Sequence, residues 1–542
     1  MKQLYYNGTF ITVNDAQPLA EALMVENGKI VAVGSLEEMQ AFRDEATEMI
    51  DLGGKTVVPG FVDGHGHIGN PAGGVPKLYP TPNGDINSKE RLLEEVRRLV
   101  EAGDILENGW FVAMGYDNAF FENSAHPNRK ELDAISTDIP MIVLHISGHV
   151  AAVNSKALEI VGWTKDTPNP EGGIIQRDPI TGELTGVVEE KAVKAITYRH
   201  VLKGLDEDSQ ARIFEKTQNF YLSRGVTTAQ DGGIINKGLL DVLEYCQAQE
   251  RIKIDVGAYP LMEQIPDTIT DYSSRQRYVN HLKIAGAKVV GDGSPQAKTA
   301  WLTAPYYVKP DKAEEGYKGY PVYTDEQMMS FCREALMHNW QMLVHCNGDA
   351  MSDQFIRCYR KAIEETGNTT PLRPVMIHAQ TVREDQLDAM KELGIMPSFF
   401  NDHVFYWGDY HYESVLGSER ANRISPLASA VKRKIPFTLH NDMPVTPINP
   451  IFCIHNAVNR VTRNGRLLGP EYAIDVMEAL KAVTIYGAYQ FFDDDIKGSL
   501  EVGKLADMVI LDKNPLTVPK EQIKDIKVLE TIKEGERLYK LQ

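Results

Sequence analysis

The ends of the chain and its centre differ in their pattern of hydrophobic and polar positions. Residues 1–60 contain short runs rich in β-branched residues, such as TFITVND and KTVVP, separated by NG and GG dipeptides. This pattern is typical of β-strands joined by tight turns. The C-terminal run GSLEVGKLADMVILD, with a turn at KNP after it, has the same character. We therefore predict a small β-sandwich domain built from both chain ends, residues 1–58 and 493–542.

The centre of the chain alternates short apolar segments with longer amphipathic ones. QMLVHCNGD precedes MSDQFIRCYRKAIEET, and PVMIHAQ precedes REDQLDAMKELG. Strand and helix alternating in units of roughly 30 to 50 residues indicates parallel βα modules. A closed barrel is favoured over an open sheet because polar residues fall where the strands end. No glycine-rich dinucleotide fingerprint follows a strand, which argues against a Rossmann fold. We predict an α/β fold with a TIM barrel across residues 59–492.

One long stretch interrupts this alternation. It contains a helical pattern (SKERLLEEVRRLVEAG), a strand-like run (IPMIVLHISGHVAAVNS) and a turn-rich piece (EGGIIQRDPITGELTGVV). We predict an inserted subdomain at about residues 70–215 that covers the barrel mouth.

Composition narrows the range of partners. Asp and Glu number 75 against 57 Lys and Arg, which gives a formal net charge of −18. An acidic surface repels nucleic-acid phosphates and anionic membranes, so we expect neither as a partner. The expected partner is a small-molecule substrate, and a homodimer is the first assembly to consider.

Cysteine usage and the N-terminal sequence bear on the compartment. The five cysteines form no CxxC pair, which argues against a disulfide framework. The N-terminus lacks the apolar stretch of a secretory signal, and no apolar run approaches the roughly 20 residues needed to cross a bilayer. A cytoplasmic location is therefore expected.

The segment TVVPGFVDGHGHIG is the most informative in the chain. An apolar strand runs directly into His65 and His67. Residues i and i+2 of a strand point to the same face, so the two imidazoles converge on one point. Neutral imidazoles suit zinc, iron, nickel or copper. The alternative is a pair of structural histidines in a loop, but the preceding strand and the neighbouring Asp63 favour a metal site.

Three further residues follow apolar runs in the same way. His345 ends WQMLV, His378 ends PVMI, and Asp442 follows IPFTLHN. A lone histidine at a strand end is more often structural than a ligand, but two in consecutive βα modules favour ligands. A carboxylate at the position of Asp442 can bind metal, act as general base on a water, or cap a turn.

Lys288 interrupts the apolar strand in LKIAGAKVVGDGS. A buried lysine is costly unless it is paired or chemically changed. Reaction of its amine with carbon dioxide gives a carbamate, an anionic metal ligand that removes this cost. The alternatives are a side chain that extends outward to solvent or pairs with Asp292.

The order of HxH, a strand lysine, two single histidines and an aspartate resembles the amidohydrolase superfamily. The flanking runs NGKIVAVG, VVPGFVDGHGH and GSLEVGKLADMVILD extend the resemblance over nearly the whole chain. The segments WFVAMGYDNAFF, SGHVAAVNSKAL and VHCNGDA are similar to its YtcJ-like branch, which includes N-substituted formamide deformylase.

This resemblance implies a (β/α)8 barrel with a metal centre at its mouth. The implied ligands are His65, His67, Lys288, His345, His378 and Asp442. Carbamylated Lys288 would bridge two divalent metals, with zinc expected, although members of the superfamily bind either one ion or two. Asp442 would also serve as general base and then acid. The implied enzyme is a metal-dependent hydrolase that cleaves a non-peptide carbon–nitrogen bond.

Three alternatives stay open at this point. A deaminase is disfavoured because His345 is not followed by an HxxE arrangement. A lactonase or phosphotriesterase can use the same metal centre, because a fold does not select a substrate. A non-catalytic regulator would normally have lost ligands, whereas all six positions are intact here.

Several residues are candidates for the substrate pocket. The predicted substrate contacts are His149, Tyr116, Asp117 and Trp301. Aromatic side chains near a barrel mouth suit an apolar or ring-bearing substrate, and Trp407 and His403 are further candidates of this kind. We expect Cys346, next to His345, to be a packing residue that faces away from the site.

Overall fold

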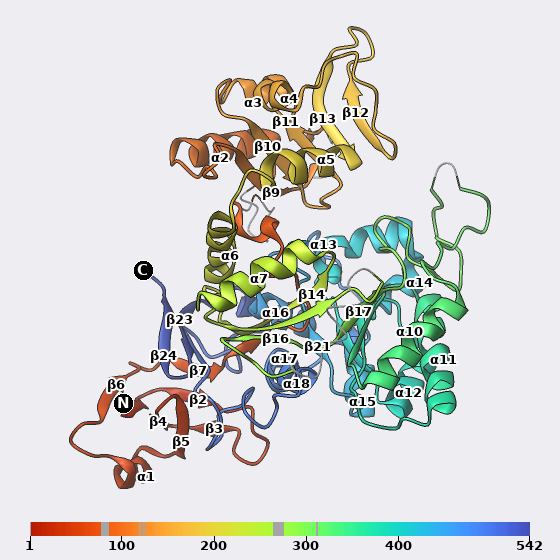
Figure 1. The fold of residues 1–542 in the computed structure, drawn as a ribbon. Coiled ribbons are helices and arrows are strands. Elements are labelled where there is room, and N and C mark those ends of the chain that lie inside the picture. Colours follow the sequence, from red (N-terminus) through yellow and green to blue (C-terminus); the bar gives the residue numbers. More distant parts are fainter. Residues whose placement is uncertain are drawn as a thin grey trace. The chain divides into compact units, whose positions relative to one another are not determined.

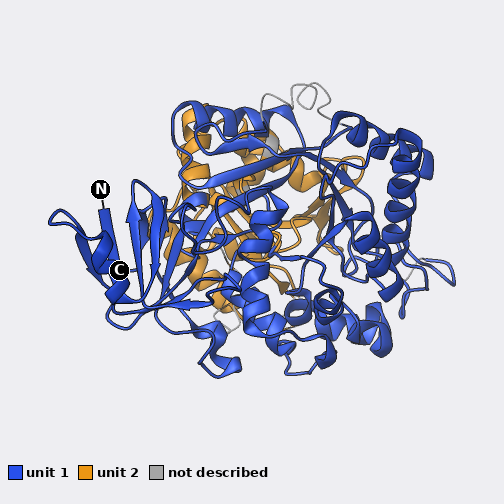
Figure 2. Cartoon of the chain, turned by 90° about the horizontal axis from the view of Figure 1, so that it is seen from below, with its two compact units in different colours: residues 1–67, 218–441, 448–542 blue, residues 68–217, 442–447 orange. Residues whose placement is uncertain are grey.

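A computed structural model describes residues 2–76, 78, 86–118, 121–122, 125–263, 276–310 and 313–542. The chain forms two compact units, coloured separately in Figure 2. Unit 1 comprises residues 1–67, 218–441 and 448–542, and unit 2 comprises residues 68–217 and 442–447. Within the described ranges, no helix is both long enough and apolar enough to span a membrane.

A six-stranded sheet of unit 1 joins the two ends of the chain (Figure 1). Strand β22 (Met508–Leu511) pairs antiparallel with β7 (Thr56–Pro59), so that Val509 lies opposite Val58. The strand order is β24-β23-β22-β7-β2-β3. The other strands are β2 (Thr9–Ile11), β3 (Leu19–Ala20), β23 (Val528–Lys533) and β24 (Glu536–Lys540).

A second sheet at the N-terminus has the order β5-β4-β1-β6. Its strands are β1 (Lys2–Tyr6), β4 (Ala22–Glu26), β5 (Lys29–Gly34) and β6 (Glu48–Asp51), with the short helix α1 (Leu36–Met39) after β5. Tyr5 and Leu23 from this sheet share one hydrophobic core with Phe10 and Ile510 from the six-stranded sheet. The two β-rich chain ends therefore bury their apolar side chains together.

The centre of unit 1 consists of parallel strands in two sheets, with the orders β16-β15-β14-β8 and β17-β18-β19-β20-β21. Their bounds are β8 (Phe61–Val62), β14 (Val226–Ile234), β15 (Asp255–Pro260), β16 (Leu282–Ile284), β17 (Ala287–Val290), β18 (Met342–Cys346), β19 (Val375–His378), β20 (Met396–Phe399) and β21 (Thr438–Leu439). Nearly every residue in them is buried, as expected for parallel strands covered on both faces. A parallel bridge between Leu261 and Lys288 connects the end of β15 to β17.

Helices follow these strands, which confirms the predicted alternation of strand and helix (Figure 1). The helices are α7 (Lys237–Ala248), α10 (Asp325–His338), α11 (Asp349–Thr366), α12 (Glu384–Leu393), α13 (His403–Tyr410), α14 (Gly417–Asn422), α15 (Leu427–Arg433), α16 (Pro450–Asn459), α17 (Val476–Ala482) and α18 (Ile485–Gln490). Their ends carry the expected caps: Thr324 forms a capping box at the start of α10, and Gly394 ends α12 in the left-handed conformation.

Unit 2 contains a mixed sheet of order β12-β13-β11-β10-β9. Its strands are β9 (Phe111–Tyr116), β10 (Met141–His145), β11 (Val150–Val153), β12 (Gly173–Arg177) and β13 (Leu184–Glu190), and its helices include α2 (Lys89–Glu101), α3 (Arg129–Asp133), α4 (Ser155–Val161) and α5 (Lys191–Ile196). Successive residues of β9 face opposite sides of the sheet, with Val112 in one apolar cluster and Ala113 in another. Unit 2 includes residues 70–215, and the predicted insertion over the barrel mouth stays a prediction.

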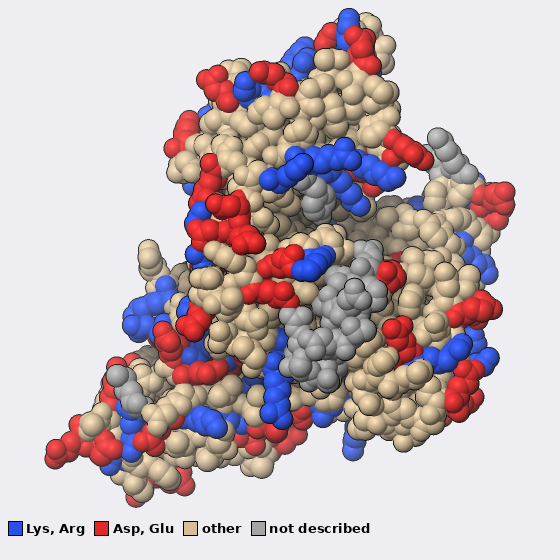
Figure 3. Space-filling view, viewed as in Figure 1, with Lys and Arg blue, Asp and Glu red and all other residues tan. Residues whose placement is uncertain are grey.

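Charged side chains are distributed over both units. On the face shown in Figure 3, Lys and Arg are interspersed with Asp and Glu. Many of them form exposed ion pairs, such as Arg360 with Glu392 at 2.6 Å.

Candidate metal centre

The HxH pair lies at the end of β8. His65 is buried, and its ring centroid is 5.2 Å from that of His67. The His65 Nδ1 atom lies 2.6 Å from Oε1 of Gln230 in β14, which orients the ring. Space for the ring depends on Gly232, because a Cβ atom at that position would lie 2.3 Å from His65 Nδ1. The local sequence thus allows a bulky imidazole to lie against the neighbouring strand.

Lys288 points into the same cluster from β17. Its Nζ atom is 3.5 Å from Nε2 of His65, and the residue is only 2% exposed. The side chain is therefore directed inward and does not extend outward to solvent. An ammonium buried beside an imidazole is costly, and conversion of the amine to a carbamate would remove that cost.

His345 and His378 complete a continuous group of imidazoles. They lie in the adjacent strands β18 and β19, and their ring centroids are 4.5 Å apart. His378 lies 5.5 Å from His65 by the same measure. The structure thus brings together the five predicted ligands of unit 1, which come from four different strands or strand ends.

The environment of His65 and His378 favours their neutral form. Burial, followed by the charge of Lys288, holds the pKa of His65 well below its usual value. Burial, followed by the neighbouring His345, does the same to the pKa of His378. Neutral imidazole nitrogens are the form that binds a divalent metal. This nitrogen-rich donor set suits a metal such as zinc.

Asp292 is the partner of His345. Its Oδ1 atom is 3.1 Å from Nδ1 of His345 and also accepts a hydrogen bond from the Asn347 amide. Its Oδ2 atom accepts from the amides of Trp301 and Gly348. This carboxylate fixes the His345 ring. The Nε2 atom of the ring, which lies 3.3 Å from Nδ2 of Asn347, is the nitrogen that would bind a metal. The sequence placed Asp292 beside Lys288 as an alternative partner, and the structure assigns it a contact with His345.

His440 is a member of the cluster that the sequence interpretation missed. Its Nε2 atom lies 3.1 Å from Nδ1 of His378, and its Nδ1 atom lies 2.8 Å from Oγ of Ser398. Its ring is 5.3 Å from His65. The sequence does contain a pattern that indicates His440: this histidine follows the apolar run IPFTL, just as His345 and His378 follow apolar runs.

Asp442 follows β21 after two intervening residues and has a positive φ of 55°. It begins the segment 442–447, which is grouped with unit 2. Within that segment its carbonyl accepts a hydrogen bond from the Val445 amide at 2.7 Å. Its role as a ligand and proton carrier stays a prediction.

Three predicted substrate contacts lie in unit 2. Tyr116 is fully buried, and its hydroxyl is 2.9 Å from Nδ1 of His126. Asp117 Oδ1 lies 3.7 Å from His145 Nε2. His149, which is exposed, lies with Nδ1 2.9 Å from Oε2 of Glu190. Tyr116 thus contributes to the core of unit 2, while Asp117 and His149 belong to polar groups of the same unit.

An aromatic group of unit 1 adjoins the imidazoles. The ring of Phe400 is 5.1 Å from His440 and 4.6 Å from His403. The ring of Trp407 is 4.5 Å from His403. These side chains provide an apolar wall next to the polar cluster. Cys346 is fully buried, and burial raises the pKa of its thiol well above the usual value.

Comparison with known proteins supports this interpretation. An amidohydrolase family model matches residues 48–539, most of the chain. The chain belongs to the amidohydrolase family. Its predicted identity as an amidohydrolase, an enzyme that hydrolyses carbon–nitrogen bonds, is thereby confirmed.

Individual relatives span almost the full length. The chain is 30% identical to Protein LONG AFTER FAR-RED 3 of Arabidopsis thaliana, over 99% of this chain and 91% of that protein. It is 25% identical to N-substituted formamide deformylase of Arthrobacter pascens, over 98% and 97%. Among solved structures, an uncharacterized metal-dependent hydrolase from Pyrococcus horikoshii has a TM-score of 0.75 at 26% identity, covering 96% of this chain and 99% of that one.

Proposed function

We propose that this chain is a metal-dependent hydrolase that cleaves the carbon–nitrogen bond of a non-peptide amide, with N-substituted formamides as the first class to test. The observation that carries the proposal is the buried cluster of imidazoles around the amine of Lys288. The relative from Arthrobacter pascens suggests the substrate class, because its similarity extends over nearly the full length of both chains.

The two parallel sheets of unit 1 are proposed to form one (β/α)8 barrel. The bridge from Leu261 to Lys288 supports continuity between β15 and β17. At the other edges, a Cβ atom on Gly64 would lie 2.4 Å from Thr438 Oγ1, so the chain after β8 runs against β21. A barrel places residues from many strand ends around one centre, as this site requires.

Divalent metal, expected to be zinc, is proposed to bind at His65, His67, His345, His378 and the carbamate of Lys288. The carbamate forms when the neutral Nζ attacks carbon dioxide and loses one proton, which gives an anionic ligand. When bound, such a metal polarises a carbonyl and lowers the pKa of water. Gln230 and Asp292 contact the Nδ1 atoms of His65 and His345, so Nε2 is the nitrogen of each ring proposed to bind the metal.

Asp442 is proposed to carry the proton. Two peptide units separate it from His440, so its Cα lies within about 7 Å of the Cα of a residue in the imidazole cluster. A carboxylate at that distance can accept a proton from the attacking water and donate it to the departing nitrogen. The neighbouring wall formed by Phe400, His403 and Trp407 suits an N-substituent that is apolar or aromatic.

The test combines metal analysis with turnover. The purified chain, supplied with zinc and bicarbonate, is expected to bind zinc and to hydrolyse N-substituted formamides with release of formate. Asp442→Asn should lower kcat by about 10² to 10⁴-fold with zinc retained, because general acid–base catalysis contributes that much. Asp388→Asn is the matched control, since Asp388 pairs with Arg433 on an exposed surface.

Two outcomes would overturn the proposal. One is a chain that binds no zinc and hydrolyses no formamide, acylated amine or cyclic amide. The other is an Asp442→Asn variant with the turnover of the unmodified chain, which would remove the proton carrier from the mechanism.

A further inference from the structure

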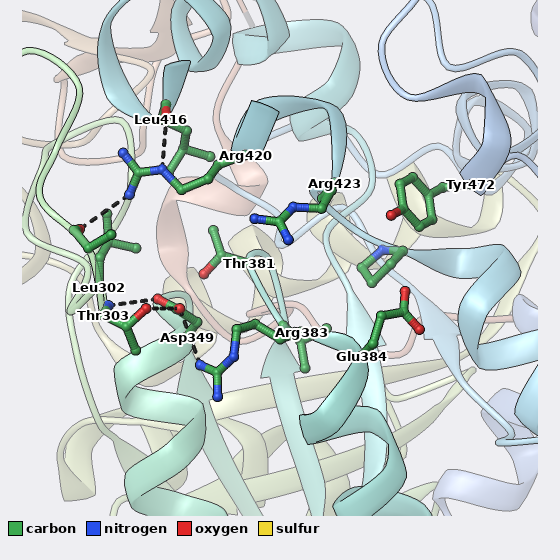
Figure 4. A pocket seen from close by; sticks show the side chains of 13 residues that line it. Leu302, Thr303, Asp349, Thr381, Arg383, Glu384, Leu416, Arg420, Arg423 and Tyr472 are labelled. Carbon is green, nitrogen blue, oxygen red and sulfur yellow. Dashed lines mark hydrogen bonds and ion pairs between the residues drawn. The ribbon is translucent and has the colours of Figure 1, made fainter. Parts of the chain in front are cut away.

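A polar cavity of unit 1 contains none of the proposed metal ligands. Its volume is about 150 Å³, and it lies among the segments that follow β17, β18 and β19, together with α14 and the start of α15. Its walls include the apolar side chains of Leu302, Val382, Leu416 and Pro426. Three arginines also line it: Arg383, Arg420 and Arg423. Figure 4 shows their side chains arranged around Thr381.

The charges of the three arginines are not balanced equally. Arg383 is engaged by three carboxylates, because it forms ion pairs with Asp349, Asp353 and Asp385 at 2.9 to 3.2 Å. Arg420 is half-buried, and its hydrogen bonds within the described part of the chain go to backbone carbonyls, those of Leu416, Ala304 and Pro305.

Arg423 is also weakly compensated. Its nearest carboxylate is Glu419, at 3.8 Å, and the side chain of Glu419 is 90% exposed. An exposed pair at that separation contributes little. The guanidinium of Arg423 therefore has donors available for a ligand in the cavity.

The two acids that line the cavity are engaged elsewhere. Asp349 accepts from the amide and hydroxyl of Thr303 as well as from Arg383. Glu384 accepts from Ser429 and Arg433, each at 2.6 Å. Because the oxygens of both carboxylates already accept from cationic or hydroxyl partners, Arg420 and Arg423 are the cavity's guanidinium groups without a close carboxylate partner among the described residues.

We propose that this cavity binds a small oxyanion, either a carboxylate or a phosphate group, at the guanidinium groups of Arg420 and Arg423. A planar guanidinium binds either group through paired, charge-assisted hydrogen bonds. The volume admits a group of this size, and the apolar wall accommodates a short hydrocarbon part attached to it.

The cavity is connected to the metal centre through Asn347. Thr381, in the cavity wall, donates its hydroxyl and its amide to the Asn347 carbonyl at 2.8 and 3.2 Å. The Asn347 amide in turn donates to Oδ1 of Asp292, the carboxylate oxygen that lies 3.1 Å from Nδ1 of His345. An anion bound beside Thr381 thus acts on the segment that holds a proposed metal ligand, which makes the cavity suitable for an effector.

The test is direct binding, which does not depend on the proposed reaction. Inorganic phosphate and acetate are titrated separately into the zinc-loaded full-length chain by calorimetry. Saturable binding of at least one is expected, with the dissociation constant raised about tenfold or more in Arg423→Gln. Arg333→Gln is the matched control, because Arg333 is similarly exposed and has one partner, Glu365, at 3.2 Å. It should bind like the unmodified chain.

A further variant separates this cavity from the metal centre. His345→Asn should keep the anion binding that Arg423→Gln loses. Preference for phosphate would identify a phosphorylated ligand, and preference for acetate a carboxylate. The proposal is wrong if neither anion binds saturably, if Arg423→Gln binds as tightly as the unmodified chain, or if His345→Asn abolishes the binding.

Discussion

Unit 1 contains two buried polar clusters whose charges are organised in opposite ways. In the first, imidazoles surround the amine of Lys288, and burial keeps His65 and His378 neutral. In the second, acids and amines alternate: Lys533 contacts Asp255 at 2.9 Å and Asp507 at 3.1 Å. The first cluster offers lone pairs to a cation, whereas the second already neutralises its own charges.

The second cluster lies at the opposite ends of the strands, with Asp255 as the first residue of β15. Asp255 also contacts Lys497 and His281. Asp255, His281 and Glu534 place ligand atoms within 4.8 Å of one another, which is close enough for a metal. Two ammonium groups already contact Asp255, so a metal there would meet unfavourable charge. Proximity of ligand atoms therefore does not identify a metal site unless the charges of the neighbours are also counted.

The largest expected effect is the loss of activity in Lys288→Met. This change removes the amine that forms the carbamate, and with it an anionic metal ligand. A bound metal supplies several kcal/mol of transition-state stabilisation, so turnover should fall about a thousandfold or more. Zinc content and formate release are measured together. Normal zinc content and turnover in this variant would show that the imidazole cluster needs no anionic lysine.

The same substitution in the other cluster should affect stability. Lys533→Met leaves Asp255 and Asp507 with one ammonium fewer, and breaking a buried ion pair costs about 3 to 5 kcal/mol. Lys288→Met in the metal-free protein should cost no more than about 1 kcal/mol, because an apolar side chain replaces a buried amine.

Urea unfolding of the metal-free variants measures this difference. Lys361→Met is the matched control, because its pair with Glu365 is exposed and spans 3.9 Å. Equal losses of stability in Lys533→Met and Lys288→Met would remove the distinction between the two clusters.

Removing His440 should weaken metal binding without removing a predicted ligand. Its contact with His378 Nδ1 fixes the orientation in which Nε2 of His378 faces the centre. Loss of such a partner typically lowers metal affinity 10- to 100-fold, so His440→Phe should show a decrease of about that size. Competition with a zinc chelator measures it. His338→Gln, a histidine at the end of α10, serves as the control, and an unchanged affinity in His440→Phe would exclude the positioning role.

The smallest expected effect is the loss of one pH-dependent contribution to the free energy of unfolding when Asp255 is replaced by Asn. Burial by itself would raise the pKa of Asp255, but Lys497 and Lys533 hold this pKa well below its usual value. The resulting stabilisation is present above the unfolded pKa of about 3.9 and is lost as pH falls through the lower folded pKa.

In the unmodified chain this contribution should make the free energy of unfolding fall by about 1 kcal/mol per pH unit below about pH 4. Replacement of Asp255 by Asn should remove that part of the pH dependence. Urea midpoints of both proteins, measured from pH 5 to pH 3, make the comparison. If the urea midpoints of both proteins changed with pH in parallel, the Asp255 carboxylate would contribute no such stabilisation.

Part of this site could be predicted from local patterns. His65 and His67 follow a strand at a spacing of two, which brings them to one face by backbone geometry alone. His345 and His378 were predicted because strand ends of parallel modules meet at one edge of a sheet, and their contact in the structure agrees. The family resemblance then made Lys288 a candidate ligand, and the structure places its amine beside His65.

The chain by itself thus determined the βα alternation, the pairs i and i+2, and the residue types available for chemistry, because these depend on short segments. Only the tertiary structure decided that His440 contacts His378, that Asp292 holds His345, and that Arg420 and Arg423 share a cavity. Those partners are separated by many residues along the chain. Their contacts, and the charges left over after pairing, arise only when the strands and helices pack together.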